Sequence, residues 1–142
     1  MKRQAFSLIS MLGLLLMAGS AVAQTIHVRA YVPFDFAVGN KTLSAGMYNV
    51  STINDRDSTE LLVQAQAGKS SMLILSNAAV NLQRADKTEL VFNKYRDQYF
   101  LADIWTAGAS RGHRLAKGTR EKELEIGQDL THQRVEIVAS LH

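Results

Sequence analysis

The stretch YVPFDFAVGNKTLSAGMYNV, residues 31–50, is the clearest indication of the fold class, because apolar residues alternate with polar or small ones on both sides of a turn signal. An alternation of period two is typical of β-strands. The pair Gly39-Asn40 lies in its middle and suits the positive φ angles of a tight hairpin turn. The stretch therefore predicts a hairpin in which Phe36 faces Leu43.

The same period continues outward from this hairpin. Upstream, residues 26–32 alternate in the same way until Pro33 interrupts them, and proline is tolerated mainly at strand edges, starts or bulges. Downstream, Gly46 predicts a bend, after which the alternation returns from Tyr48 to Thr52. The N-terminal third of the chain therefore reads as strand, turn, strand, bend and strand.

Further segments carry the same signal. We expect strands at residues 60–65, 70–75, 89–95, 99–106 and 134–141, with a short turn at 96–98 and a glycine-rich loop at 107–114. The segment TREKELEIG, residues 119–127, is the one helical candidate, with Thr119 as a possible N-cap and Gly127 just past its end. The sequence predicts a mainly antiparallel β sandwich or small barrel with one short helix near the C-terminus.

The first residues predict the compartment. Lys2 and Arg3 precede an apolar run at residues 8–17, and the small residues Ala21-Val22-Ala23 follow. This order is typical of a secretory signal peptide, and the run is shorter than the roughly 20 residues that cross a bilayer. We expect a signal peptide at residues 1–23 and one exported domain at 24–142, periplasmic or secreted; a retained membrane anchor is the alternative.

The composition and net charge of the chain exclude some classes of function and argue against others. The formal charge of +3 falls to +1 without Lys2 and Arg3, so we expect no nucleic-acid partner. The chain has no cysteine, which excludes disulfides, thiol catalysis and thiolate metal sites. The four histidines are scattered without a recognised ligand spacing, so we expect no metal site and no cofactor; they are His27, His113, His132 and His142.

Three blocks, VPFDFAVGNKTLSAGMYNV, LVFNKYRDQYFLADIWTAG and GHRLAKGTREKEL, cover much of residues 24–142. They resemble successive blocks of a family of small exported bacterial proteins of the acidobacterial type, with similar VPFDF and YFLxxxW-like blocks. Ser44 stands where that pattern often has proline, and Arg96 where a turn glycine is common. The resemblance implies export and a β architecture, and it supplies no catalytic residues.

Two carboxylates are candidates for acid and base catalysis of the kind that glycoside-cleaving enzymes use, namely Asp35 and Asp103. Alternation directs Asp35 toward solvent or a turn amide. It places Asp103 on one face with Tyr99, Leu101 and Trp105. Paired or solvated carboxylates are commoner than catalytic ones, and that is the alternative for both.

Aromatic residues cluster around one predicted hairpin. We take Tyr95, Tyr99 and Trp105, with Asp103, as a candidate ligand groove for sugars, lipids or peptides, because aromatic rings offer apolar faces with polar edges. A buried core is the alternative, since sheet proteins bury such rings.

A short basic run offers a different site. Arg111, Arg114 and Lys117 are not interrupted by an acidic residue, so they could capture an anionic surface or polymer. The acidic residues of 121–125 follow closely, and pairing with them on a solvated face is the alternative.

The favoured function is a non-enzymatic exported domain that binds a ligand or acts at the cell surface. A small hydrolase using Asp103 or Asp35 is one alternative. A transmembrane β-barrel is another, disfavoured by the short strands and the missing closing aromatic residue.

Overall fold

The computed structural model describes residues 25–54, 57–68, 70–127 and 132–142. The predicted leader at residues 1–23 lies outside this range, so the signal peptide and the export of the chain stay predictions.

Over the described residues the chain is mainly β with one short helix, which confirms the predicted fold class. Its strands are β1 (His27–Val32), β2 (Phe36–Val38), β3 (Lys41–Leu43), β4 (Gly46–Asn54), β5 (Asp57–Ala65), β6 (Ser71–Val80), β7 (Glu89–Tyr95), β8 (Gln98–Trp105), β9 (Arg111–Leu115), β10 (Gln133–Val138) and β11 (Ser140–Leu141). The helix α1 spans Thr119–Ile126. The strand pairs are antiparallel except for the short β2–β8 contact, which is parallel.

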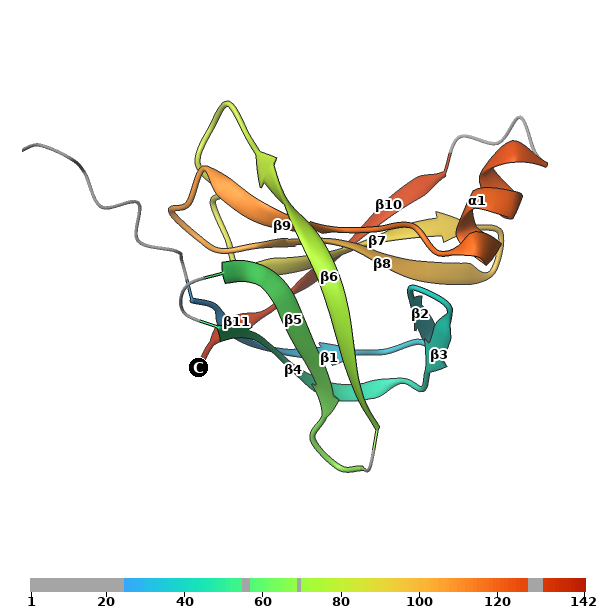
Figure 1. Ribbon diagram of the computed structural model, residues 1–142, viewed down its shortest axis with the longest axis horizontal. Helices are drawn as coiled ribbons and strands as arrows, with labels where there is room; N and C mark the ends of the chain where they lie inside the picture. The colour runs from blue at the N-terminus through green and yellow to red at the C-terminus, as the bar shows by residue number, and fades with distance from the viewer. Residues whose placement is uncertain (1–24, 55–56, 69, 128–131) are drawn as a thin grey trace, which may run out of the picture.

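The strands form one sheet of 11 strands that folds over into two layers. The order β10-β7-β8-β9-β6-β5-β4-β1-β11 runs from one edge to the other. Strand β6 belongs to both layers: residues 71–75 pair with β5, and residues 76–80 pair with β9. Figure 1 shows β6 crossing from the layer of β1, β4 and β5 to the layer of β7, β8 and β9. The result is a sandwich that is not closed into a barrel.

The core lies between the two layers and consists of the inward side chains of the alternating strands. Phe92 on β7 is fully buried near its centre, with edge-to-face ring contacts to Phe34 at 5.1 Å and Phe36 at 5.3 Å. Aromatic pairs favour this geometry because the positive ring edge meets the negative ring face. The first hairpin and the residues just before it thus add two rings to the core around Phe92.

The predicted first hairpin is confirmed in detail. Phe36 pairs with Leu43, and Gly39 adopts a φ of 58° in the turn. Gly46, with a φ of 156°, begins β4 where the bend was expected. The burial of Val28 and Val50 follows the expected alternation.

Other local predictions need correction. The predicted loop at 107–114 is wrong in its second half, because Arg111–Leu115 form β9 between β6 and β8. The predicted strand at 134–141 is interrupted at Ala139, so that β10 pairs with β7 and β11 pairs with β1. Strand β6 also continues past residue 75 to Val80, where it changes partners.

The helix is present where the sequence predicted it, but its N-cap residue differs. Gly118 occupies the cap position, and Thr119 is the first helical residue. The backbone N–H of Thr119 donates to Oδ1 of Asn40 at 2.9 Å. A side chain from the first hairpin therefore satisfies an amide that the helix cannot pair by itself.

Candidate functional site

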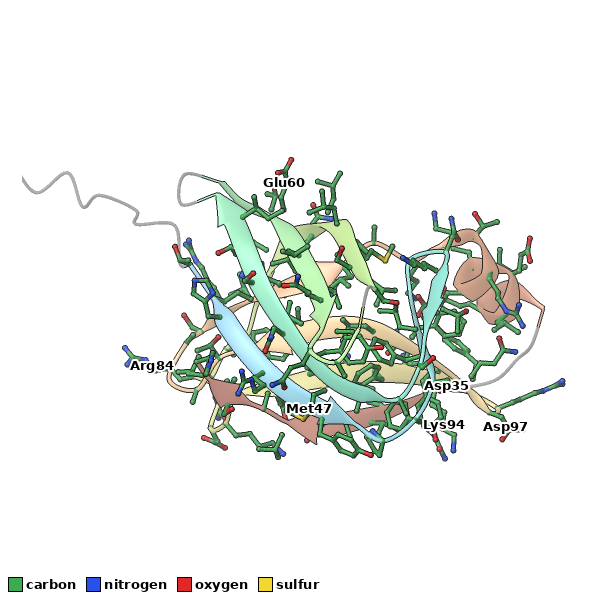
Figure 2. All side chains as sticks on the ribbon, turned by 90° about the horizontal axis from the view of Figure 1, so that it is seen from below. Asp35, Met47, Glu60, Arg84, Lys94 and Asp97 are labelled. Atoms are coloured by element: carbon green, nitrogen blue, oxygen red, sulfur yellow. The ribbon has the colours of Figure 1, made fainter. Side chains whose placement is uncertain are left out.

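The outward side of the layer β10-β7-β8-β9, called here the polar face, carries two adjoining pockets. The large pocket has a volume of about 750 Å³ and lies beside the connection between β6 and β7. The small pocket has a volume of about 220 Å³ and lies beside α1. Arg114 and Arg134 line both. Figure 2 shows Arg84 of the β6–β7 connection and Asp97 of the β7–β8 turn at opposite ends of the molecule.

A bulge in β8 places Asp103 on the polar face. Val91 pairs with Asp103 and Phe92 pairs with Leu101, so Ala102 has no counterpart on β7. One extra residue reverses the side on which the following side chains lie. Leu101 therefore packs in the core between the layers, whereas Asp103 lies on the outer side.

The predicted grouping of Asp103 with Tyr99 and Leu101 is wrong for this reason. Tyr99 stacks on Phe34 with ring centroids 3.8 Å apart, on the core side of β8. Trp105 does share the polar face with Asp103 and lines the large pocket.

Asp103 is the centre of an ion-pair network. Its side chain is only 1% exposed, and Arg114 Nε donates to Oδ1 at 2.8 Å while Arg134 Nη2 donates to Oδ2 at 2.6 Å. The side chains of Arg114 and Arg134 remain 60% and 49% exposed. Hydrogen bonding to Asp103 raises the pKa of Arg114 further above its usual value. The buried carboxylate thus fixes two guanidinium groups at the surface.

A second polar network forms the wall of the small pocket next to α1. Glu121 is 3% exposed, and its Oε1 accepts hydrogen bonds from Asn93 Nδ2 at 3.0 Å and from the Tyr95 hydroxyl at 3.3 Å. Burial and the neighbouring Glu121 raise the pKa of Tyr95 to about 12. In the described part of the chain, the Asn93 amide oxygen is buried and has no hydrogen-bond partner.

The large pocket has a mixed wall. Trp105 packs with Val91 and Ala79 in a small apolar cluster, directly over Gly112. Beside them, Lys87 forms ion pairs with Glu136 at 2.9 Å and Glu89 at 3.3 Å. These contacts raise the pKa of Lys87, and the hydrogen bond from Lys87 lowers the pKa of Glu136.

The structure brings together two of the three basic residues of the predicted anion site. Arg114 and Lys117 line the small pocket, while Arg111 at the start of β9 lines neither pocket. Lys117 Nζ also lies 2.7 Å from Glu125 Oε1, which is the pairing expected for a solvated face. Hydrogen bonding to Lys117 lowers the pKa of Glu125.

Asp35 lies apart from Asp103. Its Oδ1 accepts a hydrogen bond from the Ala45 amide at 2.9 Å, so of the two expected surroundings, solvent or a turn amide, the structure shows the turn amide. It lines a different pocket, between the first hairpin and the β7–β8 turn. The two carboxylates that the sequence offered as a pair therefore belong to separate sites.

Sequence patterns did not single out Asn93 and Arg134, and they predicted Glu121 only as a partner of the basic run, whereas it bonds to Asn93 and Tyr95. Each lies in a segment that the sequence correctly predicts as a strand or a helix. A polar side chain in such a segment is normally expected to be exposed to solvent, so nothing marks it as part of a site. Only the pairing of β7 with β10 and the position of α1 bring them together.

Within the described ranges, no helix has the length and apolar composition needed to span a membrane. The same ranges contain no group of three or more His, Cys, Asp or Glu residues arranged to hold a metal ion. No protein-family model, curated protein or solved structure matches this chain.

Proposed function

We propose that the protein is an exported, non-enzymatic domain that binds a small polar ligand on its polar face. The observation that carries this proposal is the pair of adjoining pockets that share Arg114 and Arg134, both half exposed and both held by the buried Asp103. Binding sites favour such fixed polar groups because little side-chain entropy is then lost when the ligand arrives. Export is supported by the leader-like residues 1–23.

Size also supports a ligand site. Pockets for small molecules usually measure about 300–1,000 Å³, and the large pocket, at about 750 Å³, lies within that range. Its wall combines the Trp105 cluster with charged groups from four segments, namely the β6–β7 connection, β7, β9 and β10. Such a mixture suits a ligand with both apolar and polar surfaces.

The environment of the two aspartates favours binding over hydrolysis. A general acid or base must reach the proton that it transfers. Both oxygens of Asp103 are engaged by arginines, and Asp35 lines a separate pocket. Neither carboxylate is placed as part of an acid–base pair.

A fragment screen tests the proposal. The purified protein is titrated with a chemically diverse fragment library, and amide NMR signals are followed for each hit. We expect saturable shifts concentrated in β7, β8, β9 and β10. Hits that map only to the opposite layer, or a complete lack of saturable hits, would contradict a binding site on the polar face.

A further inference from the structure

The small pocket restricts which part of a ligand it can hold. At about 220 Å³ it is smaller than the roughly 300 Å³ at which small-molecule sites usually begin. It adjoins the large pocket through Arg114 and Arg134. It therefore suits one terminal group of a ligand whose remainder lies in the large pocket.

The charge of the small pocket favours a single negative charge. Its described lining also contains His132; with His132 counted as neutral, it has three cations, Arg114, Lys117 and Arg134, against the carboxylates Asp103 and Glu121. Since Lys117 also pairs with Glu125, the surplus is at most one positive charge. The carboxylates are almost fully buried, whereas the two arginines are half exposed, so a ligand meets the cations first. This balance matches a monoanion better than a doubly charged phosphate.

The arginines retain hydrogen-bond donors for such a group. A guanidinium has five N–H donors. The bonds to Asp103 use two from Arg114 and one from Arg134. A planar carboxylate is well matched to the planar fork of a guanidinium, which binds it through parallel hydrogen bonds.

Asn93 indicates a second property of the ligand, a hydrogen-bond donor. It is only 5% exposed, its Nδ2 donates to Glu121, and its buried Oδ1 has no hydrogen-bond partner among the residues that the structure describes. A buried acceptor without a donor costs free energy, and an amide oxygen can only accept. A ligand group with an O–H close to its carboxylate would satisfy this atom at the wall of the pocket.

We propose that the small pocket binds the carboxylate end of a hydroxylated acid, and that its ligand is an acidic sugar of the uronic-acid class. The carboxylate lies against Arg114 and Arg134, a ring hydroxyl donates to Asn93, and the rest of the sugar chain extends into the large pocket toward Trp105. This inference rests on the proposed binding function and names its ligand class.

The first test compares four probes on the purified protein by amide NMR titration: D-glucuronate, D-glucose, propionate and inorganic phosphate. We expect D-glucuronate to shift the signals of Asn93, Asp103 and Arg114. D-glucose and phosphate lack the carboxylate and should bind at least about tenfold more weakly, the effect of losing one hydrogen bond to a charged group. Propionate lacks the hydroxyl and leaves the buried Asn93 amide oxygen unpaired, so it should bind at least about fivefold more weakly. Equal binding of D-glucose or tighter binding of phosphate would overturn the carboxylate assignment, and equal binding of propionate would overturn the role of Asn93.

The second test uses variants. Arg134→Lys keeps the charge and loses the planar fork, so D-glucuronate affinity should fall about tenfold or more. Arg111→Lys, on the same strand as Arg114 but outside both pockets, is the matched control and should bind normally. Lys117→Ala leaves Asp103 paired and should weaken binding while the melting temperature changes little. Unchanged affinity in both Arg134→Lys and Lys117→Ala would refute the proposed pocket.

The two proposals can fail separately. If library fragments bind the polar face but D-glucuronate does not, the ligand class is wrong and the binding function stands. If neither fragments nor D-glucuronate bind there, both proposals are wrong.

Discussion

Gly112 lies beneath the ring of Trp105, where β9 passes under the end of β8. A Cβ at this position would lie 2.6 Å from Trp105 Cε3 and 2.7 Å from the Ile104 carbonyl oxygen. The second of these atoms is backbone, so the clash cannot be relieved by the side chain alone. Glycine is required here because it lets two strands and an indole ring approach closely.

We therefore expect Gly112→Ala to lower the free energy of unfolding by about 1–3 kcal/mol, the usual effect of overpacking. Trp105 is the only tryptophan, so its displacement should also shift the fluorescence emission toward the red. Gly68→Ala is the control, because a Cβ there meets nothing closer than 4.0 Å. Unchanged emission and stability in Gly112→Ala would contradict the close packing.

The ionisation of Tyr95 should make the stability of the protein depend on pH in the alkaline range. Its pKa is raised from 10.0 to about 12 in the folded protein, mainly by burial and by the carboxylate of Glu121. Above pH 10 the unfolded chain loses this proton while the folded protein keeps it, so the folded state is penalised as the pH rises. We expect stability from this group to be fully present below about pH 10 and to fall between about pH 10 and 12.

Denaturant unfolding at a series of alkaline pH values measures this loss. Tyr95→Phe has no titrating hydroxyl, so its stability should fall less steeply over the same interval. Parallel curves for the original protein and Tyr95→Phe would show that Tyr95 is not the group responsible.

At the scale of elements, α1 is held by polar contacts. Its one buried residue is Glu121, and Asn40 pairs with its first amide. A helix of eight residues is marginal by itself in water. Its position therefore depends on the turn at Gly39-Asn40 and on the network at Glu121, both of which belong to other segments.

Gly118→Ala tests this dependence. The new Cβ would lie 2.5 Å from the Gly39 carbonyl oxygen and 2.6 Å from Asn40 Oδ1, so the helix cannot keep its contact with the turn. We expect faster hydrogen exchange in α1, a loss of about 1–3 kcal/mol in stability, and weaker ligand binding in the small pocket. Lys122→Ala, on the exposed side of the same helix, is the control. Native exchange rates in Gly118→Ala would contradict the role of this contact.

At the scale of the molecule, the C-terminal segment joins the two edges of the sheet. Strand β10 pairs with β7 at one edge, β11 pairs with β1 at the other, and only Ala139 lies between them. Ala139 itself donates to the Thr88 carbonyl at 2.9 Å. This segment therefore tethers the layers on the side opposite β6.

Removal of residues 140–142 should free the edge of β1. The pairs Val28–Leu141 and Arg29–Ser140 and the His142 N–H bond to His27 are lost. At about 1 kcal/mol for each hydrogen bond, we expect stability to fall by roughly 1–3 kcal/mol. Hydrogen exchange should rise in β1 and stay unchanged in the β7–β8 hairpin. A uniform rise across both layers would show that the segment stabilises the whole sheet.

Much of the local structure follows from the sequence alone. The period-two alternation identifies most strands, and Gly39-Asn40 identifies the first turn together with its register. Arg96 shows that a turn can also be recognised without glycine: it adopts a φ of 54° in the short β7–β8 turn predicted from the flanking strands. Strand alternation and turn formation depend on residues that are close together in the chain, and for this reason they can be predicted from the sequence.

The polar face depends on contacts between distant segments. The bulge at Ala102 decides that Asp103 faces outward, β9 forms because β6 and β8 offer it partners, and Asn40 caps a helix 79 residues away. None of these has a local signature, because a bulge, a strand partner and a remote cap are each chosen by the packing of the whole sheet. Local signals are thus enough to predict a β domain with one short helix near the C-terminus, whereas the charged groups that gather around Asp103 follow only from the pairing of distant strands.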